Sequence, residues 1–189
     1  MKNGRPPKIP GIPTLYRGTR FRSRTEARWA VLFDELGWGW VYEPRDLAGY
    51  IPDFILRLDE APLLVEVKGD AVTVEQLVEH AHKIEISGWD GEALLVGAAP
   101  WHLTSSQPLI GWFGERVRIG EDLEWSWGDA RLFDCISCGH TSVLAASGSW
   151  RCRICGEGAG NEHVGAVLSI PLEAAWAKSS NRVQWSPNT

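Results

Sequence analysis

The sequence predicts an α/β fold in which helices flank a mixed sheet and a small cysteine-rich module follows. Three observations predict it: a helical stripe with a clear start, two alternating segments separated by a turn, and a second helix followed by a buried strand. With 189 residues, 44% of them hydrophobic and 23% charged, the chain is long enough for one domain with a core plus a small addition.

Residues 1–16 are expected to form a basic, proline-rich arm, because prolines oppose both helix and central strand. Residues 1–28 contain eight basic side chains and one acid, a local charge of +7, which leaves −12 for the rest since the net charge is −5. Such a region can bind phosphates by releasing counterions, although a solvated tail is the alternative that composition leaves open. The candidate nucleic-acid contacts are Arg17, Arg20, Arg22 and Arg24.

The amino-terminal sequence MKNGRPPKIPGIP is polar where a secretory signal needs an apolar stretch. No apolar run approaches the ~20 residues that span a bilayer. We therefore expect a cytoplasmic protein with no membrane partner. Four cysteines would stay reduced in that compartment, which favours metal binding over disulfides.

A first helix is expected to begin after Ser23, because Glu26 stands three residues later, as in a capping box. Gly37 is placed to end it, and Trp38–Glu43 is a short strand candidate. The apolar stripe of this helix consists of Trp29, Ala30, Phe33 and Leu36. An acid in the first turn is fully explained by capping, so this glutamate alone predicts no chemistry.

Two strands are expected at Tyr50–Leu58 and Leu63–Lys68, where apolar residues alternate with others. A second helix is expected at about Val74–Ile86, capped by Thr73, and a buried strand at Ala93–Ala98. The inward face of that helix is expected to consist of Val74, Leu77, Val78, Ala81 and Ile84. Strand, helix and strand in this order form a crossover, so the sheet should contain parallel and antiparallel neighbours.

The turn between the two strands also predicts a site. If it is symmetric, Leu58 lies opposite Leu63 and Asp53 lies opposite Lys68. Opposed residues share a face, as do residues two apart, so Asp53, Glu66 and Lys68 should converge. Charged residues on the wet face of a hairpin are the alternative.

The expected convergence suits phosphodiester hydrolysis. Two neighbouring carboxylates repel each other but hold a divalent cation such as Mg²⁺ or Mn²⁺ well. The ion can activate a water molecule, and a lysine beside it can stabilise the charge of the transition state.

The same stretches resemble a known family. Phe21–Arg28, Leu36–Gly37, Tyr42–Pro44, Tyr50–Phe54 and Val65–Gly69 resemble the PD-(D/E)xK nuclease superfamily. The similarity is greatest to the branch that holds phage endonuclease-I-type Holliday-junction resolvases and TnsA-like transposase endonucleases, and it covers roughly half of the chain.

The resemblance implies a restriction-endonuclease-like domain over residues 17–100. It implies that Asp53 and Glu66 are metal ligands, that Lys68 is the catalytic lysine, and that Glu26 is an additional acid near the metal. The expected activity is Mg²⁺-dependent DNA cleavage by a phage-type or junction-resolving endonuclease. A non-catalytic DNA-binding or scaffold protein with the same fold is the alternative. The sequence does not decide whether the substrate is DNA or RNA. It also leaves the cleavage specificity and a possible homodimer open.

Four cysteines form two C-x-x-C-G motifs with thirteen residues between them: Cys135, Cys138, Cys152 and Cys155. Each tight turn directs two sulfurs at one point, and four thiolates leave no open position on a zinc ion. The pattern predicts a structural zinc ribbon over residues 131–160. Whether the ribbon contacts DNA, a protein partner or only the nuclease domain stays open.

Two segments complete the predicted organisation. Residues 101–130 are expected to form a tryptophan-rich β extension of irregular structure. Residues 161–189 are expected to contain a short helix at about Leu172–Ser180 and a polar tail.

Overall fold

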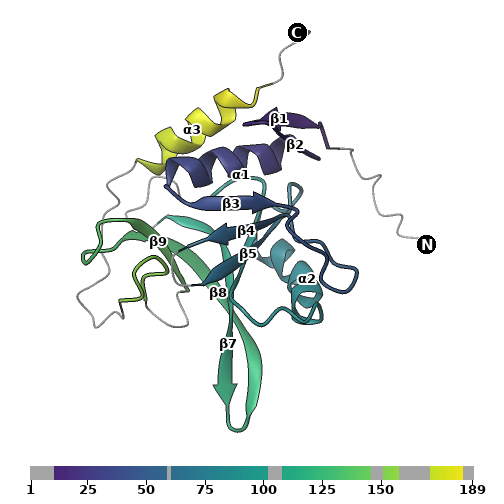
Figure 1. Ribbon diagram of the computed structural model, residues 1–189, viewed down its shortest axis with the longest axis vertical. Coiled ribbons are helices and arrows are strands. Elements are labelled where there is room, and N and C mark those ends of the chain that lie inside the picture. Colours follow the sequence, from purple (N-terminus) through teal and green to yellow (C-terminus); the bar gives the residue numbers. More distant parts are fainter. Residues whose placement is uncertain (1–10, 59–60, 102–107, 146–150, 158–170, 185–189) are drawn as a thin grey trace.

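The centre of the computed structural model is a seven-stranded sheet with helices on both faces (Figure 1). The structure describes residues 11–58, 61–101, 108–145, 151–157 and 171–184. From one edge to the other, the strands are β3 (Gly39–Tyr42), β4 (Phe54–Arg57), β5 (Pro62–Val67), β6 (Ala93–Val96), β7 (Leu109–Ile119), β8 (Asp122–Asp134) and β9 (Thr141–Ala145). Strands β5 and β6 are parallel and the other neighbours are antiparallel, which confirms the mixed α/β sheet.

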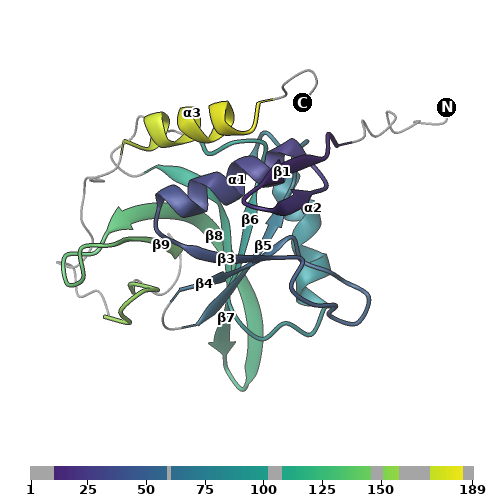
Figure 2. The same ribbon diagram turned by 45° about the horizontal axis from the view of Figure 1, so that its top comes forward.

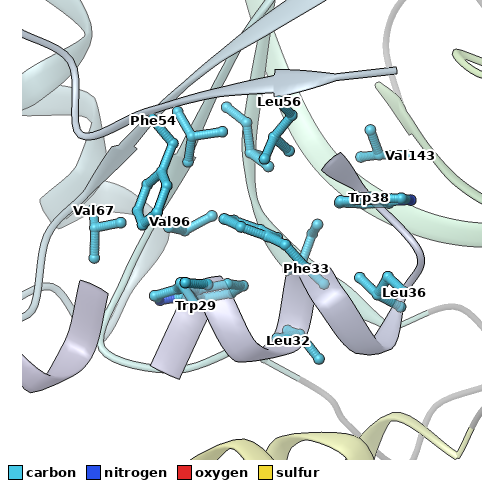
Figure 3. Close-up of a cluster of buried hydrophobic side chains, with 14 of the residues drawn as sticks. Trp29, Leu32, Phe33, Leu36, Trp38, Phe54, Leu56, Val67, Val96 and Val143 are labelled. Carbon is cyan, nitrogen blue, oxygen red and sulfur yellow. The ribbon is translucent and has the colours of Figure 1, made fainter. Parts of the chain in front are cut away.

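Helix α1 (Arg24–Glu35) covers one face of the sheet and begins where the sequence predicted. The hydroxyl of Ser23 accepts a 3.1 Å hydrogen bond from the backbone N–H of Glu26, as an N-cap should. The buried face of α1 packs against strand residues in the main core. Figure 3 labels residues of this core from both the helix and the sheet: Trp29, Leu32, Phe33, Leu36, Trp38, Phe54, Leu56, Val67, Val96 and Val143. This packing fixes the start of α1 relative to the ends of β4 and β5.

Two further elements lie beside α1 on the same face. Helix α3 (Leu172–Arg182) runs along it in both ribbon views, and the rings of Trp29 and Trp176 are 5.1 Å apart (Figures 1 and 2). The short strands β1 (Thr14–Tyr16) and β2 (Thr19–Phe21) form a separate hairpin. The end of the predicted basic arm is therefore a strand, and residues 1–10 lie outside the described residues.

Helix α2 (Val74–Glu85) crosses from β5 to β6 on the opposite face, which confirms the predicted crossover and the N-cap at Thr73. Its inward face contains Leu77, Ala81 and Ile84. Val78 was also expected to face inward, but its exposed fraction is 44% because it is turned by about 100° from Leu77. The side chain of Val74 lies outside the described part.

The pairing of β4 with β5 differs by two residues from the predicted one: Leu63 lies opposite Leu56, not Leu58. The last pair before the turn is Arg57 with Pro62, and residues 59–60 lie outside the described residues. A shift of two residues returns every side chain to the same face, so the predicted convergence is kept. Continued by one pair, the register sets Asp53 opposite Glu66.

Residues 101–130 were expected to form a tryptophan-rich β extension of irregular structure, and the part that the structure describes is β-structure with regular pairing. Strands β7 and β8 form a long hairpin whose far end projects from the body (Figures 1 and 2). Trp127 stacks between Trp112 and Trp125, with ring centroids 5.4 Å apart in each pair. Gly114 leaves room for this stack, since a Cβ there would lie 2.6 Å from the ring of Trp127. Because β7 pairs with β6, the sheet continues across the predicted boundary at residue 100.

No helix among the described residues is long and apolar enough to cross a bilayer. The longest, α1 and α2, have 12 residues each, against the ~20 that a bilayer requires.

Candidate active site and metal centre

The candidate catalytic residues lie where β4 begins and β5 ends. Asp53 directly precedes β4, Glu66 lies on β5 and Lys68 follows it. The carboxylate of Asp53 accepts a 2.8 Å hydrogen bond from the backbone N–H of Val67, and the ammonium of Lys68 forms an ion pair with Glu66. The structure therefore brings the three predicted residues together.

The carboxyl group of Asp53 is buried, and its pKa is raised. Its exposed fraction is 4%. Burial and the nearby carboxylate of Glu66 raise the pKa of Asp53 to about 7, and the N–H of Val67 and the charge of Lys68 only partly oppose them. A carboxylate held at this cost is typical of functional sites, although structural ion pairs also produce such shifts.

Both carboxylate oxygens of Glu66 have a partner. The hydroxyl of Tyr50 donates a 2.8 Å hydrogen bond to one oxygen, and Lys68 pairs with the other. Burial and the charge of Glu66 raise the pKa of Tyr50, so this phenol stays a hydrogen-bond donor. These contacts fix the Glu66 carboxylate in one orientation.

Glu26 has a structural role beside any chemical one. Its carboxylate accepts hydrogen bonds from the hydroxyls of Ser23 at 2.8 Å and Tyr42 at 2.6 Å, and from the backbone N–H of Arg22 at 3.1 Å. Its charge is one of the causes that raise the pKa of Asp53, so it lies within electrostatic reach of the other acids. The residue thus joins the helix start to the candidate site.

Of the four candidate nucleic-acid contacts, Arg22 reaches the site. Its guanidinium contacts Asp53 at 2.6 Å and Glu43 at 2.8 Å, and 60% of its side chain is exposed. Arg17 instead pairs with Asp34, on the last turns of α1. Arg20 is exposed on β2, and Arg24 is the first residue of α1.

The cysteines form a second, separate centre. Among the described residues, they are the one group of three or more Cys, His, Asp and Glu placed to hold a metal ion, and their ligand atoms all lie within 4.8 Å of one another. The Sγ atoms are 3.8 Å apart in the pairs Cys135 with Cys155 and Cys138 with Cys152. A tetrahedron with zinc–sulfur bonds of about 2.3 Å has edges of about 3.8 Å. The cluster therefore fits zinc, and its four thiolates would supply the whole coordination shell.

Two equivalent turns build this cluster. Gly139 donates its N–H to the carbonyl of Cys135 at 2.7 Å, and Gly156 donates to Cys152 at 3.0 Å. Both glycines have positive φ, 73° and 74°, a conformation that other residues adopt at a cost. The glycine of each C-x-x-C-G motif is thus favoured by the turn.

The second turn docks on the sheet through Arg153, whose exposed fraction is 2%. Its guanidinium donates two 3.0 Å hydrogen bonds to the carboxylate of Glu92, the residue before β6, and lies 4.7 Å from the ring centre of Phe113. Glu115 lies 3.9 Å away as a second anion. The cysteine module therefore contacts the α/β sheet through a buried ion pair.

No family model, curated protein or solved structure matches the chain. The tyrosines at the site, Tyr42 and Tyr50, were not predicted as site residues, and neither was the contact of Arg22 with Asp53. The available signal was that these residues lie inside the stretches that carry the family resemblance.

Proposed function

We propose that the chain is a metal-dependent DNA endonuclease that hydrolyses phosphodiester bonds. The observation that carries the proposal is the pair of buried carboxylates, Asp53 and Glu66, beside the ammonium of Lys68. Buried like charges are costly, and well-packed apolar residues of similar volume would serve stability as well or better. The resemblance to PD-(D/E)xK nucleases adds the same residues in the same order.

The donor set suits a hard divalent cation. Asp53 and Glu66 offer carboxylate oxygens that now bind Arg22, Val67, Tyr50 and Lys68, all of them positive or hydrogen-donating groups. Mg²⁺ or Mn²⁺ held there would lower the pKa of a coordinated water and neutralise charge on the phosphate. The restriction-endonuclease-like fold is part of the proposal, and it agrees with the mixed sheet and its crossover.

Each residue of the candidate site would then have one role. Asp53 and Glu66 hold the cation, and Tyr50 orients Glu66 through its hydroxyl. Lys68 supplies a positive charge to the phosphate as charge builds on it. Glu26 holds Tyr42 and the backbone at Arg22, which positions the loop before α1.

Cleavage assays test the proposal directly. Zinc-loaded protein is incubated with supercoiled plasmid, linear duplex and a four-way junction, with and without Mg²⁺. We expect cleavage that needs Mg²⁺ and is lost in Asp53→Ala and Lys68→Ala. Asp122→Ala is the matched control, because Asp122 lies exposed in β8 at the tip of the hairpin.

Two results would overturn the proposed nuclease activity. One is no cleavage of any substrate by the unchanged protein, and the other is equal cleavage by Asp53→Ala. Tight DNA binding without cleavage would favour the non-catalytic alternative. The substrate that is cut fastest would decide between a junction-resolving and a general nuclease.

A further inference from the structure

Arg22 is the one candidate DNA contact that also bonds a candidate metal ligand. Its Nη2 lies 2.6 Å from Oδ1 of Asp53, and its Nε lies 2.8 Å from Glu43. The Asp53 side chain is 5% exposed, whereas that of Arg22 is 60% exposed. A solvent-accessible cation thus contacts a buried carboxylate.

The contact uses an oxygen that a metal ion would need. Oδ2 of Asp53 accepts a hydrogen bond from the backbone N–H of Val67, and Oδ1 accepts one from the guanidinium of Arg22. A guanidinium and a divalent cation cannot both occupy the same side of one carboxylate oxygen, because both are positive. Arg22 and a metal therefore compete for Asp53.

The backbone of Arg22 is held by contacts that do not involve its side chain. Its N–H contacts Glu26 at 3.1 Å and the hydroxyl of Tyr42 at 3.0 Å. The side chain contacts named above are both to carboxylates, and a guanidinium binds phosphate oxygens with the same geometry. A rotation of this exposed side chain is enough to exchange one anion for another.

We infer that Arg22 pairs with Asp53 in the absence of DNA and transfers to a DNA phosphate when DNA binds, which frees Asp53 for the metal. This inference rests on the proposed nuclease function and adds an order to it: the metal site becomes complete when substrate is present. Linkage then requires that metal and DNA each strengthen the binding of the other by the same factor.

The first test is Mn²⁺ binding to zinc-loaded protein without DNA, measured by calorimetry. Arg22→Gln should bind Mn²⁺ roughly tenfold more tightly than the unchanged protein, the size of one hydrogen bond between charged groups. Arg20→Gln is the matched control, because it removes the same charge two residues away and leaves the Asp53 contact in place. Asp53→Asn should weaken binding, which locates the ion.

The outcomes separate the two proposals. Equal or weaker Mn²⁺ binding by Arg22→Gln overturns the role of Arg22 and leaves the nuclease proposal standing. An equal gain in Arg20→Gln also overturns it, since the effect would then be general charge. No Mn²⁺ binding by any of the proteins overturns the metal site and the inference with it.

The second test measures the coupling between metal binding and DNA binding. Binding of a labelled DNA duplex is followed by fluorescence anisotropy with and without Ca²⁺, a hard cation that takes oxygen ligands. Ca²⁺ should strengthen DNA binding by the unchanged protein, and the gain should shrink in Arg22→Gln. The same gain in both proteins overturns the inference.

Discussion

The backbone N–H of Val67 donates a 2.8 Å hydrogen bond to the carboxylate of Asp53. Val67 lies between Glu66 and Lys68 in the chain, so one bond across the hairpin sets the position of Asp53 relative to both of them. The contact connects the end of β5 to the residue before β4. Four measurements follow from this site and from the cysteine module.

Asp53→Asn should stabilise the protein at neutral pH when no Mg²⁺ is present. The folded-state pKa of Asp53, about 7, lies above its ordinary value of 3.8, so ionisation costs the folded state. The stability that this group contributes is present below about pH 4 and is lost as the pH rises through about 7. The gain of the variant should therefore be larger at about pH 8 than at about pH 5, on the order of a few kcal/mol.

Urea unfolding at the two pH values measures this difference. Asp122→Asn, at the exposed tip of the hairpin, is the control and should show little difference between them. A variant that is less stable than the unchanged protein at both pH values would contradict the assignment of a buried, costly charge.

Tyr50→Phe should slow cleavage without unfolding the protein. The change removes the 2.8 Å hydrogen bond from the phenol to Glu66 and keeps the ring. Loss of one hydrogen bond to a charged group corresponds to a roughly tenfold lower rate. Tyr16→Phe is the control, because it removes an equal 2.8 Å bond to Asp34, which lies on α1 outside the candidate site. Equal rates for the two variants would remove Tyr50 from the site.

Arg153→Ala should destabilise the fold by about 3–5 kcal/mol, because it leaves the carboxylate of Glu92 without its buried partner. Arg151→Ala is the matched comparison. Arg151 contacts the same carboxylate at 3.3 Å, but 37% of its side chain is exposed, so its loss should cost about 1 kcal/mol or less. Chemical unfolding of both variants measures the difference, and equal losses would contradict the burial argument.

Zinc should bind at one ion per chain and support the cysteine module. Cys138→Ser replaces one of the four thiolates, so it should lower both the zinc content and the thermal midpoint. Ile136→Ala changes the same turn at a side chain that is 66% exposed, and it should leave the zinc content unchanged. Elemental analysis and thermal unfolding check both. Full zinc content in Cys138→Ser would rule out a four-thiolate site.

Local patterns predicted much of this fold. The cap at Ser23, the crossover through α2 and the two cysteine turns depend on residues a few positions apart, where short-range geometry decides. The convergence of Asp53 and Glu66 was also predictable, because alternation along strands survives an error of two residues in pairing.

Contacts between distant segments were not predictable in the same way. The regular pairing of β7 with β8 places Trp127 over Gly114, a contact that the tryptophan-rich sequence did not predict. The pairing of Arg153 with Glu92 joins residues 61 positions apart, and no periodic pattern reports such a contact. The bonds of Tyr50 and Arg22 to the acids likewise arise from tertiary packing.

The ion pair between Arg153 and Glu92 also constrains how the sequence can change over evolutionary time. A substitution at either position alone removes the closest partner of a largely buried charge, whereas replacing both by apolar residues of similar volume removes the cost. The two positions should therefore vary together among relatives. A pair of neutral residues at these positions would be tolerated, and a single neutral residue facing the original charge should be rare.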